Sequence, residues 1–175
     1  MDRGKVILAL DLSLTSTGYA VGVVLGGEIK LIEVGSINNK RYAKRSQAFR
    51  LHQIATKLKE LYRKYEFDYI IKERGFVNAR AMATQALFKV AGVADLISFA
   101  FGHEIKAELS PSTIKKLVTG DGRADKEKVQ KAVEAFLGND VNGLNLIEFI
   151  NDDESDAVAC LIAYCVQEKL IEAVA

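Results

Sequence analysis

The sequence predicts a single α/β domain built around a mixed β-sheet. Three segments rich in apolar and β-branched residues come first, at Lys5–Asp11, Gly18–Leu25 and Glu28–Ser36. Helical patterns then alternate with two further short strands, Phe67–Glu73 and Glu104–Leu109. Three strands joined as hairpins, followed by alternating helices and strands, favour a mixed five-stranded sheet flanked by helices, in which three antiparallel strands precede the other two.

Length and composition agree with one domain. The chain has 175 residues, of which 49% are apolar and 27% are charged, so a single domain over 1–175 can bury a sizeable core. The N-terminal segment Asp2–Lys5 leads straight into the first strand and does not resemble a signal peptide. Cys160 and Cys165 lie five residues apart on a predicted helix and point to different sides. We therefore expect reduced cysteines and a cytoplasmic protein with no membrane partner.

The turns that join the first three strands differ in their chemistry. Gly26-Gly27 separates the second and third strands and predicts a tight hairpin turn. The first strand ends at Asp11, and the segment Ser13–Gly18 after it is rich in hydroxyl groups, which indicates a hairpin loop of five to seven residues. A carboxylate at the end of a buried strand is costly unless it is paired or binds a cation. Asp11 is therefore the first candidate functional residue.

Helices are expected between the strands and at the C-terminus. Apolar residues at helical spacing, with bases on the other face, predict a helix over about Tyr42–Tyr65. Ser110 and Pro111 are typical N-cap and first-turn residues of a helix, which Gly120-Asp121-Gly122 interrupts. Asp125 is predicted to cap the next helix. The last two helices are expected at Lys126–Leu137 and Asp152–Ala173.

The predicted helix Ala79–Phe101 is apolar nearly all round. Such a helix is either central in the core or covered by a partner subunit. Small residues such as Ala83, Ala86 and Gly92 would permit close approach of a second helix. In a domain of this size, we favour a homodimer interface on Ala79–Phe101.

Charge is unevenly distributed although the net charge is only +1. Nine Lys or Arg residues and one acid, Glu60, lie between Lys40 and Lys64, whereas five acids and no base lie between Glu148 and Asp156. A basic face beside an acidic pocket is the combination that a phosphodiester-cutting metalloenzyme needs. Taken alone, the basic run is equally consistent with a solvated helix face.

Acidic residues stand at three expected ends of secondary structure. Asp11 ends the first strand, Glu73 ends the fourth, and Asp153 and Asp156 share one face of the last helix. If the first and fourth strands are neighbours, Asp11 and Glu73 meet at one edge of the sheet. Four converging carboxylates repel one another unless they bind divalent metal, and oxygen ligands suit Mg²⁺ or Mn²⁺. Two such ions about 4 Å apart can stabilise the attacking water and the leaving oxygen of a phosphoryl transfer.

Each acid also has an ordinary structural interpretation. Asp152 and Asp153 could merely cap a helix and complement its dipole, Glu73 could be an exposed strand end, and Asp11 could be a turn residue. His52 and His103 are isolated in the sequence, so a zinc site is not expected.

Four segments resemble the motifs of the RuvC Holliday junction resolvases, which have the RNase H-like fold. Leu8–Ala20 is similar to the opening motif of that family, and Ile71–Phe76 is similar to its second acidic motif. Ser110–Lys126 resembles its Pro-to-Lys segment, and Asp153–Ala159 resembles its closing D-x-x-D-A-[LV]-A motif. The matches follow the order of the family over about 11–160, and the first and last are the most specific.

The resemblance implies a metal-dependent DNA endonuclease. Asp11, Glu73, Asp153 and Asp156 would bind two catalytic Mg²⁺ ions in each active site, with Mn²⁺ able to substitute. The protein would act as a homodimer that makes symmetric nicks in branched DNA, foremost in four-way junctions, during recombination, repair or phage DNA processing.

The resemblance also implies residues that contact DNA. Lys115 and Lys126 match lysines that lie near the cleaved phosphate, where they would support catalysis. Phe76 matches an aromatic residue beside the bases of the junction, where stacking would suit it. Arg74 and Arg123 complete the expected DNA-binding set.

The sequence departs from the pattern of the family at two places. Lys72 precedes Glu73 where the family usually has an apolar residue, so the strand is expected to be less buried or its lysine to reach solvent. Gly138–Ile150 aligns with no part of the pattern. The compact chain would fit a phage-borne member, which leaves cellular partners and cleavage-sequence preference open.

Two other classes of protein remain open at this point. A sugar-kinase or actin-like ATPase also begins with a strand, an aspartate, a hydroxyl-rich turn and a glycine, but it needs a second domain that 175 residues do not accommodate. A junction-binding protein with a vestigial metal site would retain the fold and the acids without the activity.

Overall fold

The computed structural model describes residues 3–75, 81–137 and 151–173 of the chain. Its strands are β1 (Lys5–Asp11), β2 (Ser16–Leu25), β3 (Glu28–Asn38), β4 (Tyr69–Glu73) and β5 (Ala107–Leu109). Its helices are α1 (Gln47–Lys64), α2 (Ala81–Ala100), α3 (Pro111–Thr119), α4 (Lys126–Leu137) and α5 (Asp152–Gln167), with a short 3-10 helix, η1 (Lys40–Tyr42).

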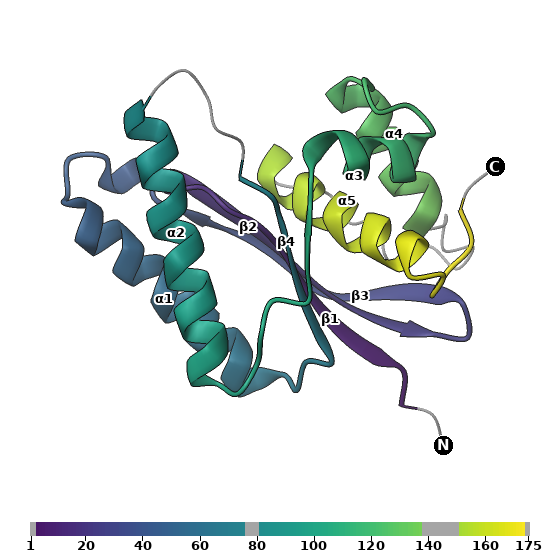
Figure 1. The fold of residues 1–175 in the computed structure, drawn as a ribbon, viewed down its shortest axis with the longest axis horizontal. Helices are drawn as coiled ribbons and strands as arrows, with labels where there is room; N and C mark the ends of the chain where they lie inside the picture. The colour runs from purple at the N-terminus through teal and green to yellow at the C-terminus, as the bar shows by residue number, and fades with distance from the viewer. Residues whose placement is uncertain (1–2, 76–80, 138–150, 174–175) are drawn as a thin grey trace.

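The predicted mixed five-stranded sheet is confirmed. Its strand order is β3-β2-β1-β4-β5, with β1, β2 and β3 antiparallel and β4 and β5 parallel to β1. Gly26 and Gly27 both have positive φ angles, +61° and +84°, which the tight turn between β2 and β3 requires. Figure 1 shows α1 and α2 on one face of the sheet and α3, α4 and α5 on the other.

Each face of the sheet has its own hydrophobic core, so β1 and β4 are apolar on both sides. Along β1, Ile7 and Ala9 belong to the core beneath α5, whereas Leu8 and Leu10 belong to the core beneath α1 and α2. Because side chains alternate along a strand, Asp11 continues the series that faces α5. In β4, Glu73 likewise follows Ile71 on the α5 face, and Lys72 follows Ile70 on the α2 face.

Helix α2 lies on the outside of the domain, so the alternative that places it centrally in the core is wrong. It buries one side, which includes Val90, Ala94 and Ile97, and it packs against α1. By length and composition α2 could also cross a membrane, a property that apolar helices of globular domains share. Four large apolar side chains of α2 are 57–77% exposed: Met82, Phe88, Leu96 and Phe99.

Three predicted boundaries are wrong for local reasons. The loop between β1 and β2 has four residues, Leu12–Thr15, because the hydroxyl-rich segment joins β2 at Ser16. Helix α1 begins at Gln47, where the Ser46 hydroxyl accepts a hydrogen bond from the Phe49 amide. Helix α5 ends at Gln167 and not at Ala173. There Lys169 adopts a φ of +55°, and the Leu170 amide donates to the Cys165 carbonyl, as in a Schellman motif.

Candidate active site

Strand pairing brings Asp11 and Glu73 to the same edge of the sheet. In the parallel pair of β1 and β4, Leu10 lies opposite Lys72. The next residue on each strand is therefore an acid, and both acids point toward α5. The expectation that these two strands are neighbours is confirmed.

Helix α5 supplies the other two acids because β2 lets it approach closely. Gly18 pairs with Asp11, and a Cβ atom on Gly18 would overlap with the backbone carbonyl oxygen of Asp153. A Cβ atom on Gly22 would lie 2.7 Å from Cδ2 of Leu161. The start of α5 thus rests directly on the backbone of β2, beside the end of β1. Sequence reasoning placed Gly18 at the end of the turn and the start of the second strand, and it missed this packing role.

A polar network fixes the start of α5 to β3. Asn151 is the N-cap residue, and its Oδ1 accepts a hydrogen bond from the Glu154 amide at 3.2 Å. Its Nδ2 donates to the Ser36 hydroxyl at 2.7 Å, and that hydroxyl donates to Oε1 of Glu154 at 3.2 Å. Asn151 is therefore the cap, and neither Asp152 nor Asp153 has that role. The sequence carries a signal for this cap, because an Asn followed three residues later by Glu resembles a capping box.

The four acids form one electrostatic cluster. Burial and, after it, the charges of Glu73, Asp156 and Asp153 raise the pKa of Asp11 to about 8, whereas the charge of Lys126 opposes the shift. Burial and the charge of Asp156 raise the pKa of Glu73 to about 7. The pKa of Asp156 is also raised, mainly by burial. Proximity of like charges in a partly buried site is the arrangement that a bound cation would relieve.

Lys115 and Lys126 lie at the rim of this cluster. Nζ of Lys126 donates a hydrogen bond of 2.8 Å to Oδ2 of Asp152, and both side chains are at least 70% exposed. The charge of Lys126 acts on Asp11 and Asp156, and the charge of Lys115 acts on Glu73 and Asp156. The structure thus brings these two predicted lysines to the acids without placing them among the four carboxylates.

The other predicted DNA-binding residues have less defined surroundings. Arg74 is exposed directly after Glu73, and its amide donates to the Leu109 carbonyl at 2.7 Å. Arg123 is exposed in the loop between α3 and α4. Phe76 lies outside the described residues, as does the segment 138–150 that aligned with no part of the family pattern.

Lys72 is buried, so the expectation of a less buried strand is wrong. Its side chain is 4% exposed, and its Nζ forms ion pairs with Asp95 of α2 and, at 3.0 Å, with Glu108 of β5. Both carboxylates are about half exposed, so the lysine reaches the surface through its partners. Strand alternation was the signal for this arrangement, because Lys72 must face away from Glu73.

The four carboxylates are of the ligand type that divalent metals prefer, but their side chains are not close enough together to coordinate one ion. Within the described ranges, no group of three His, Cys, Asp or Glu side chains stands close enough to hold a metal ion. The charges of neighbouring acids nevertheless contribute to the raised pKa values of Asp11 and Glu73, so the acids lie close enough to repel one another. Carboxylate oxygens in such a cluster match the ligand preference of Mg²⁺ and Mn²⁺.

The hydroxyl-rich loop after Asp11 is closed by its own hydrogen bonds. The Thr17 hydroxyl donates to the Ser13 carbonyl at 2.7 Å, and the Ser13 and Thr15 hydroxyls lie 2.9 Å apart. These contacts stabilise the hairpin between β1 and β2. The loop is therefore built as a turn that supports Asp11.

Comparison with known proteins decides the family. The family described as crossover junction endodeoxyribonuclease RuvC matches residues 7–165, which include all four acids. The chain belongs to the RuvC family. The RuvC protein of Orientia tsutsugamushi (strain Ikeda) is 27% identical over 94% of this chain and 98% of the relative. The RuvC protein of Alkaliphilus metalliredigens is 30% identical over 91% of this chain and 92% of the relative.

Solved structures of RuvC-type proteins share the fold. The structure described as T. thermophilus RuvC in complex with Holliday junction substrate has a TM-score of 0.81 and 18% identity, over 95% of this chain and 96% of that chain. The yeast mitochondrial Holliday junction resolvase Ydc2 has a TM-score of 0.66 and 14% identity, over 95% of this chain and 80% of that chain. The RNase H-like fold expected from the motifs is confirmed.

Proposed function

We propose that this RuvC-family protein is a divalent-metal-dependent endonuclease that resolves four-way DNA junctions. The observation that carries the proposal is the convergence of Asp11, Glu73, Asp153 and Asp156 from β1, β4 and α5, where burial and mutual repulsion raise the pKa of Asp11 and of Glu73. Membership of a family of crossover junction endodeoxyribonucleases supports the same conclusion. Recombination, repair or phage DNA processing in the cytoplasm is the setting that we assign.

We assign the four carboxylates as ligands of two Mg²⁺ ions, which Mn²⁺ can replace. Bound metal would supply an activated water and would neutralise charge that develops on the cleaved phosphate. The carboxylates would orient that centre, and the raised pKa values of Asp11 and Glu73 mean that these two side chains must lose protons before they can act as ligands. The side chains must also move closer together to bind metal, because no three acidic, His or Cys side chains among the described residues are close enough to hold an ion.

The two rim lysines complete the site. Lys115 and Lys126 lie where a phosphate that approaches the acids would meet positive charge. Lys126 can exchange Asp152, its exposed partner, for a phosphate oxygen at little cost, because surface ion pairs contribute little stability. We expect these lysines to position the phosphate and to stabilise its transition state.

A nicking assay on a synthetic four-way junction tests the proposal. Asp11→Asn should bind the junction but cut it at least about 100-fold more slowly in Mg²⁺, because a ligand of the metal centre is lost. Asp152→Asn is the matched control, since this exposed neighbour of Asp153 should leave cleavage within a few-fold of the parent. Equal cleavage by Asp11→Asn and the parent would refute the site. If the parent binds junctions but cuts none in Mg²⁺ or Mn²⁺, the site is vestigial.

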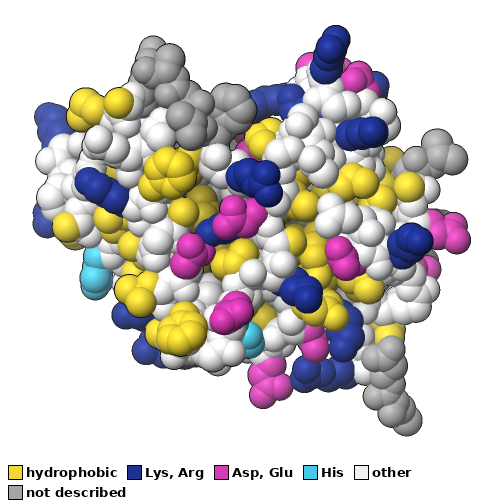
Figure 2. Space-filling model, in the orientation of Figure 1, with side chains coloured by type: hydrophobic (Ala, Val, Ile, Leu, Met, Phe, Trp, Pro, Cys, Tyr) yellow, Lys and Arg dark blue, Asp and Glu magenta, His cyan; other side chains and the backbone are white. Residues whose placement is uncertain are grey.

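We further propose a homodimer that associates through α2 and makes the two nicks symmetrically. Figure 2 shows hydrophobic side chains on the surface over α2. Leu96 of α2 is 66% exposed, and Phe99 is 70% exposed, which is unusual for a helix of a monomer. Leu96→Asp should yield monomers in sedimentation experiments without loss of folding. Ile32→Asp, at an exposed apolar residue of β3, should leave the dimer intact.

A further inference from the structure

Lys72 is a buried cation on the strand that carries Glu73. Its side chain is 4% exposed, and its Nζ forms ion pairs with Asp95 of α2 and, at 3.0 Å, with Glu108 of β5. Lys72, Asp95 and Glu108, the Lys72 triad, therefore join three elements of the fold. Because side chains alternate along a strand, the triad and Glu73 lie on opposite faces of the same strand end.

Stability is a weak explanation for a buried lysine at this position. Removal of a cation from water is costly, and a buried ion pair is often no more stabilising than apolar side chains of similar volume. Ile70, the preceding residue of β4 on this face, is apolar and fully buried. Asp95 and Glu108 are about half exposed, so water can solvate both carboxylates without the lysine.

A cavity lies beside the triad, between the end of β4 and α2. Its volume is about 280 Å³, well above the roughly 30 Å³ that one water occupies in the liquid. Lys72, Glu73 and Asp95 line it together with apolar side chains of α2: Leu87, Phe88 and Ala91. Because the apolar side chains leave this space unfilled, the ion pair between Lys72 and Asp95 carries much of the connection between the strand end and α2.

The second ion pair of the triad secures β5, which leads to Lys115. Strand β5 is a three-residue strand at the edge of the sheet, and its Glu108 lies opposite Lys72. The chain then enters α3 through the N-cap residue Ser110, and the charge of Lys115 on that helix acts on Glu73. The triad thus links the strand of a candidate metal ligand to the helix of a candidate phosphate contact.

We propose that Lys72 is a positioning residue for cleavage, which acts through Asp95 and Glu108 to hold the ends of β4 and β5 in register. Glu73 and Lys115 then meet the same phosphate. The inference rests on the proposed function, because it takes Glu73 as a metal ligand. A small displacement of a reacting group lowers the rate of the chemical step strongly. Loss of the triad should therefore slow cleavage and leave junction binding unchanged.

Lys72→Met removes the charge and keeps an unbranched side chain. Single-turnover cleavage of a four-way junction in Mg²⁺ should slow at least about tenfold. The Kd for the junction in EDTA should stay within about twofold, because a buried lysine neutralises no phosphate. The Tm should change by less than about 5 °C, since an apolar side chain can replace a buried ion pair. Lys72→Arg has room in the cavity and keeps the charge, so it should cleave within about threefold of the parent rate.

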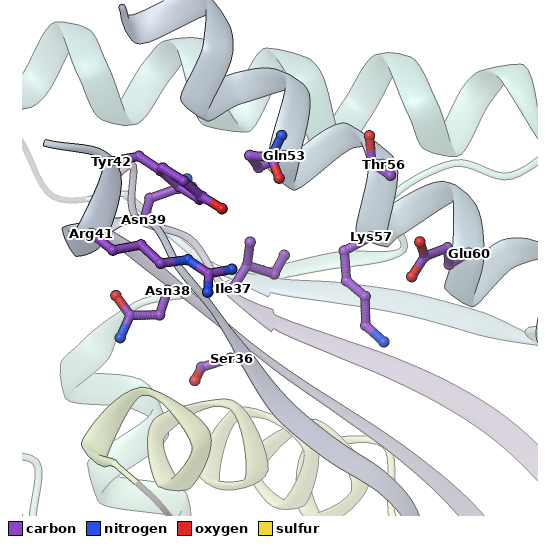
Figure 3. Close-up of a pocket in the computed structure, with 10 residues that line it drawn as sticks. All are labelled: Ser36, Ile37, Asn38, Asn39, Arg41, Tyr42, Gln53, Thr56, Lys57 and Glu60. Atoms are coloured by element: carbon purple, nitrogen blue, oxygen red, sulfur yellow. The ribbon is translucent and has the colours of Figure 1, made fainter. Parts of the chain in front are cut away.

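A partner of the triad and a second lysine supply the controls. Asp95→Asn should slow cleavage in the parent but not in Lys72→Met, where the ion pair is already lost. Figure 3 shows Lys57 extending from α1 toward the sheet, where its Nζ pairs with Glu33 of β3 at 3.1 Å. Lys57→Met removes an ion pair from elements that carry none of the four acids. Its cleavage rate should stay within about twofold of the parent.

Hydrogen exchange in EDTA separates this inference from the proposed function. The Arg74 amide, which donates to the Leu109 carbonyl at 2.7 Å, should exchange at least about fivefold faster in Lys72→Met and at the parent rate in Lys57→Met. Cleavage by Lys72→Met at the parent rate, a folded Lys72→Arg as slow as Lys72→Met, or unchanged exchange at Arg74 would overturn the inference. If the parent cuts no junction but exchange at Arg74 still rises, the proposed function fails and the role of the triad in holding β4 remains.

Discussion

Asp11→Asn should stabilise the metal-free protein while it abolishes cleavage. The pKa of Asp11 is about 8 in the fold and 3.8 in the absence of its surroundings, because burial and three neighbouring acids oppose its ionisation. The folded state therefore keeps a proton that the unfolded chain releases, and stability falls as the pH rises from about 4 to about 8. At pH 7 the gap is about 3 pH units, which sets an upper limit of about 4 kcal/mol on the cost of Asp11.

Asparagine has nearly the same side-chain shape as aspartate but carries no charge. We expect Asp11→Asn to raise the free energy of unfolding by about 2–4 kcal/mol in EDTA at pH 7, or the Tm by about 5–15 °C. At pH 3 the difference should nearly vanish, because Asp11 is then largely protonated even when the chain unfolds. Thermal unfolding in EDTA across this pH range measures the effect.

Metal and a neighbouring acid supply the controls. Added Mg²⁺ should raise the Tm of the parent more than that of Asp11→Asn, because ligand binding stabilises the fold by mass action. Asp152→Asn should change stability by less than about 0.5 kcal/mol, since Asp152 is exposed. A destabilised Asp11→Asn at pH 7, or a stabilisation that does not depend on pH, would refute the electrostatic account of the cluster.

Two further substitutions test how the site is held and used. Gly18→Ala should cost about 1–3 kcal/mol of stability and more than tenfold in cleavage rate, because the added methyl group would displace the Asp153 backbone. Denaturant unfolding and the nicking assay measure the two effects, and a variant as stable and as active as the parent would contradict this packing role. Lys115→Ala should slow junction cleavage about 100-fold at unchanged Tm, because its charge acts on the acids. The control Lys116→Ala, at the exposed neighbouring residue, should cleave at the rate of the parent. Equal cleavage rates for the two variants would exclude Lys115 from the site.

The periodicity of the sequence predicted most of the fold. The positions of β1, α3 and α4 follow from apolar runs and from caps such as Ser110 and Asp125, whose side chains accept hydrogen bonds as expected. Local patterns suffice there because each cap and turn acts over a few residues. The end of α5 was missed because a lysine, Lys169, occupies the left-handed position that glycine usually marks.

The candidate acids were also found by sequence, and Asp11 and Glu73 were expected to meet at one edge only on the condition that their strands are neighbours. Asp11, Glu73, Asp153 and Asp156 stand at predicted element ends, and the family motifs connect them. The strand order supplies that condition, because the parallel pairing of β1 with β4 brings to one edge of the sheet two acids that lie 62 residues apart in the chain.

The sequence by itself determined the elements, the acids and the family, because these depend on local pattern and on motif. Only the tertiary structure decided that Gly18 makes room for Asp153, that Lys72 turns away to pair with Asp95, and that α2 leaves its apolar side exposed. Each of these depends on which surfaces meet across the sheet. Such long-range contacts follow from packing, which no short stretch of the chain encodes.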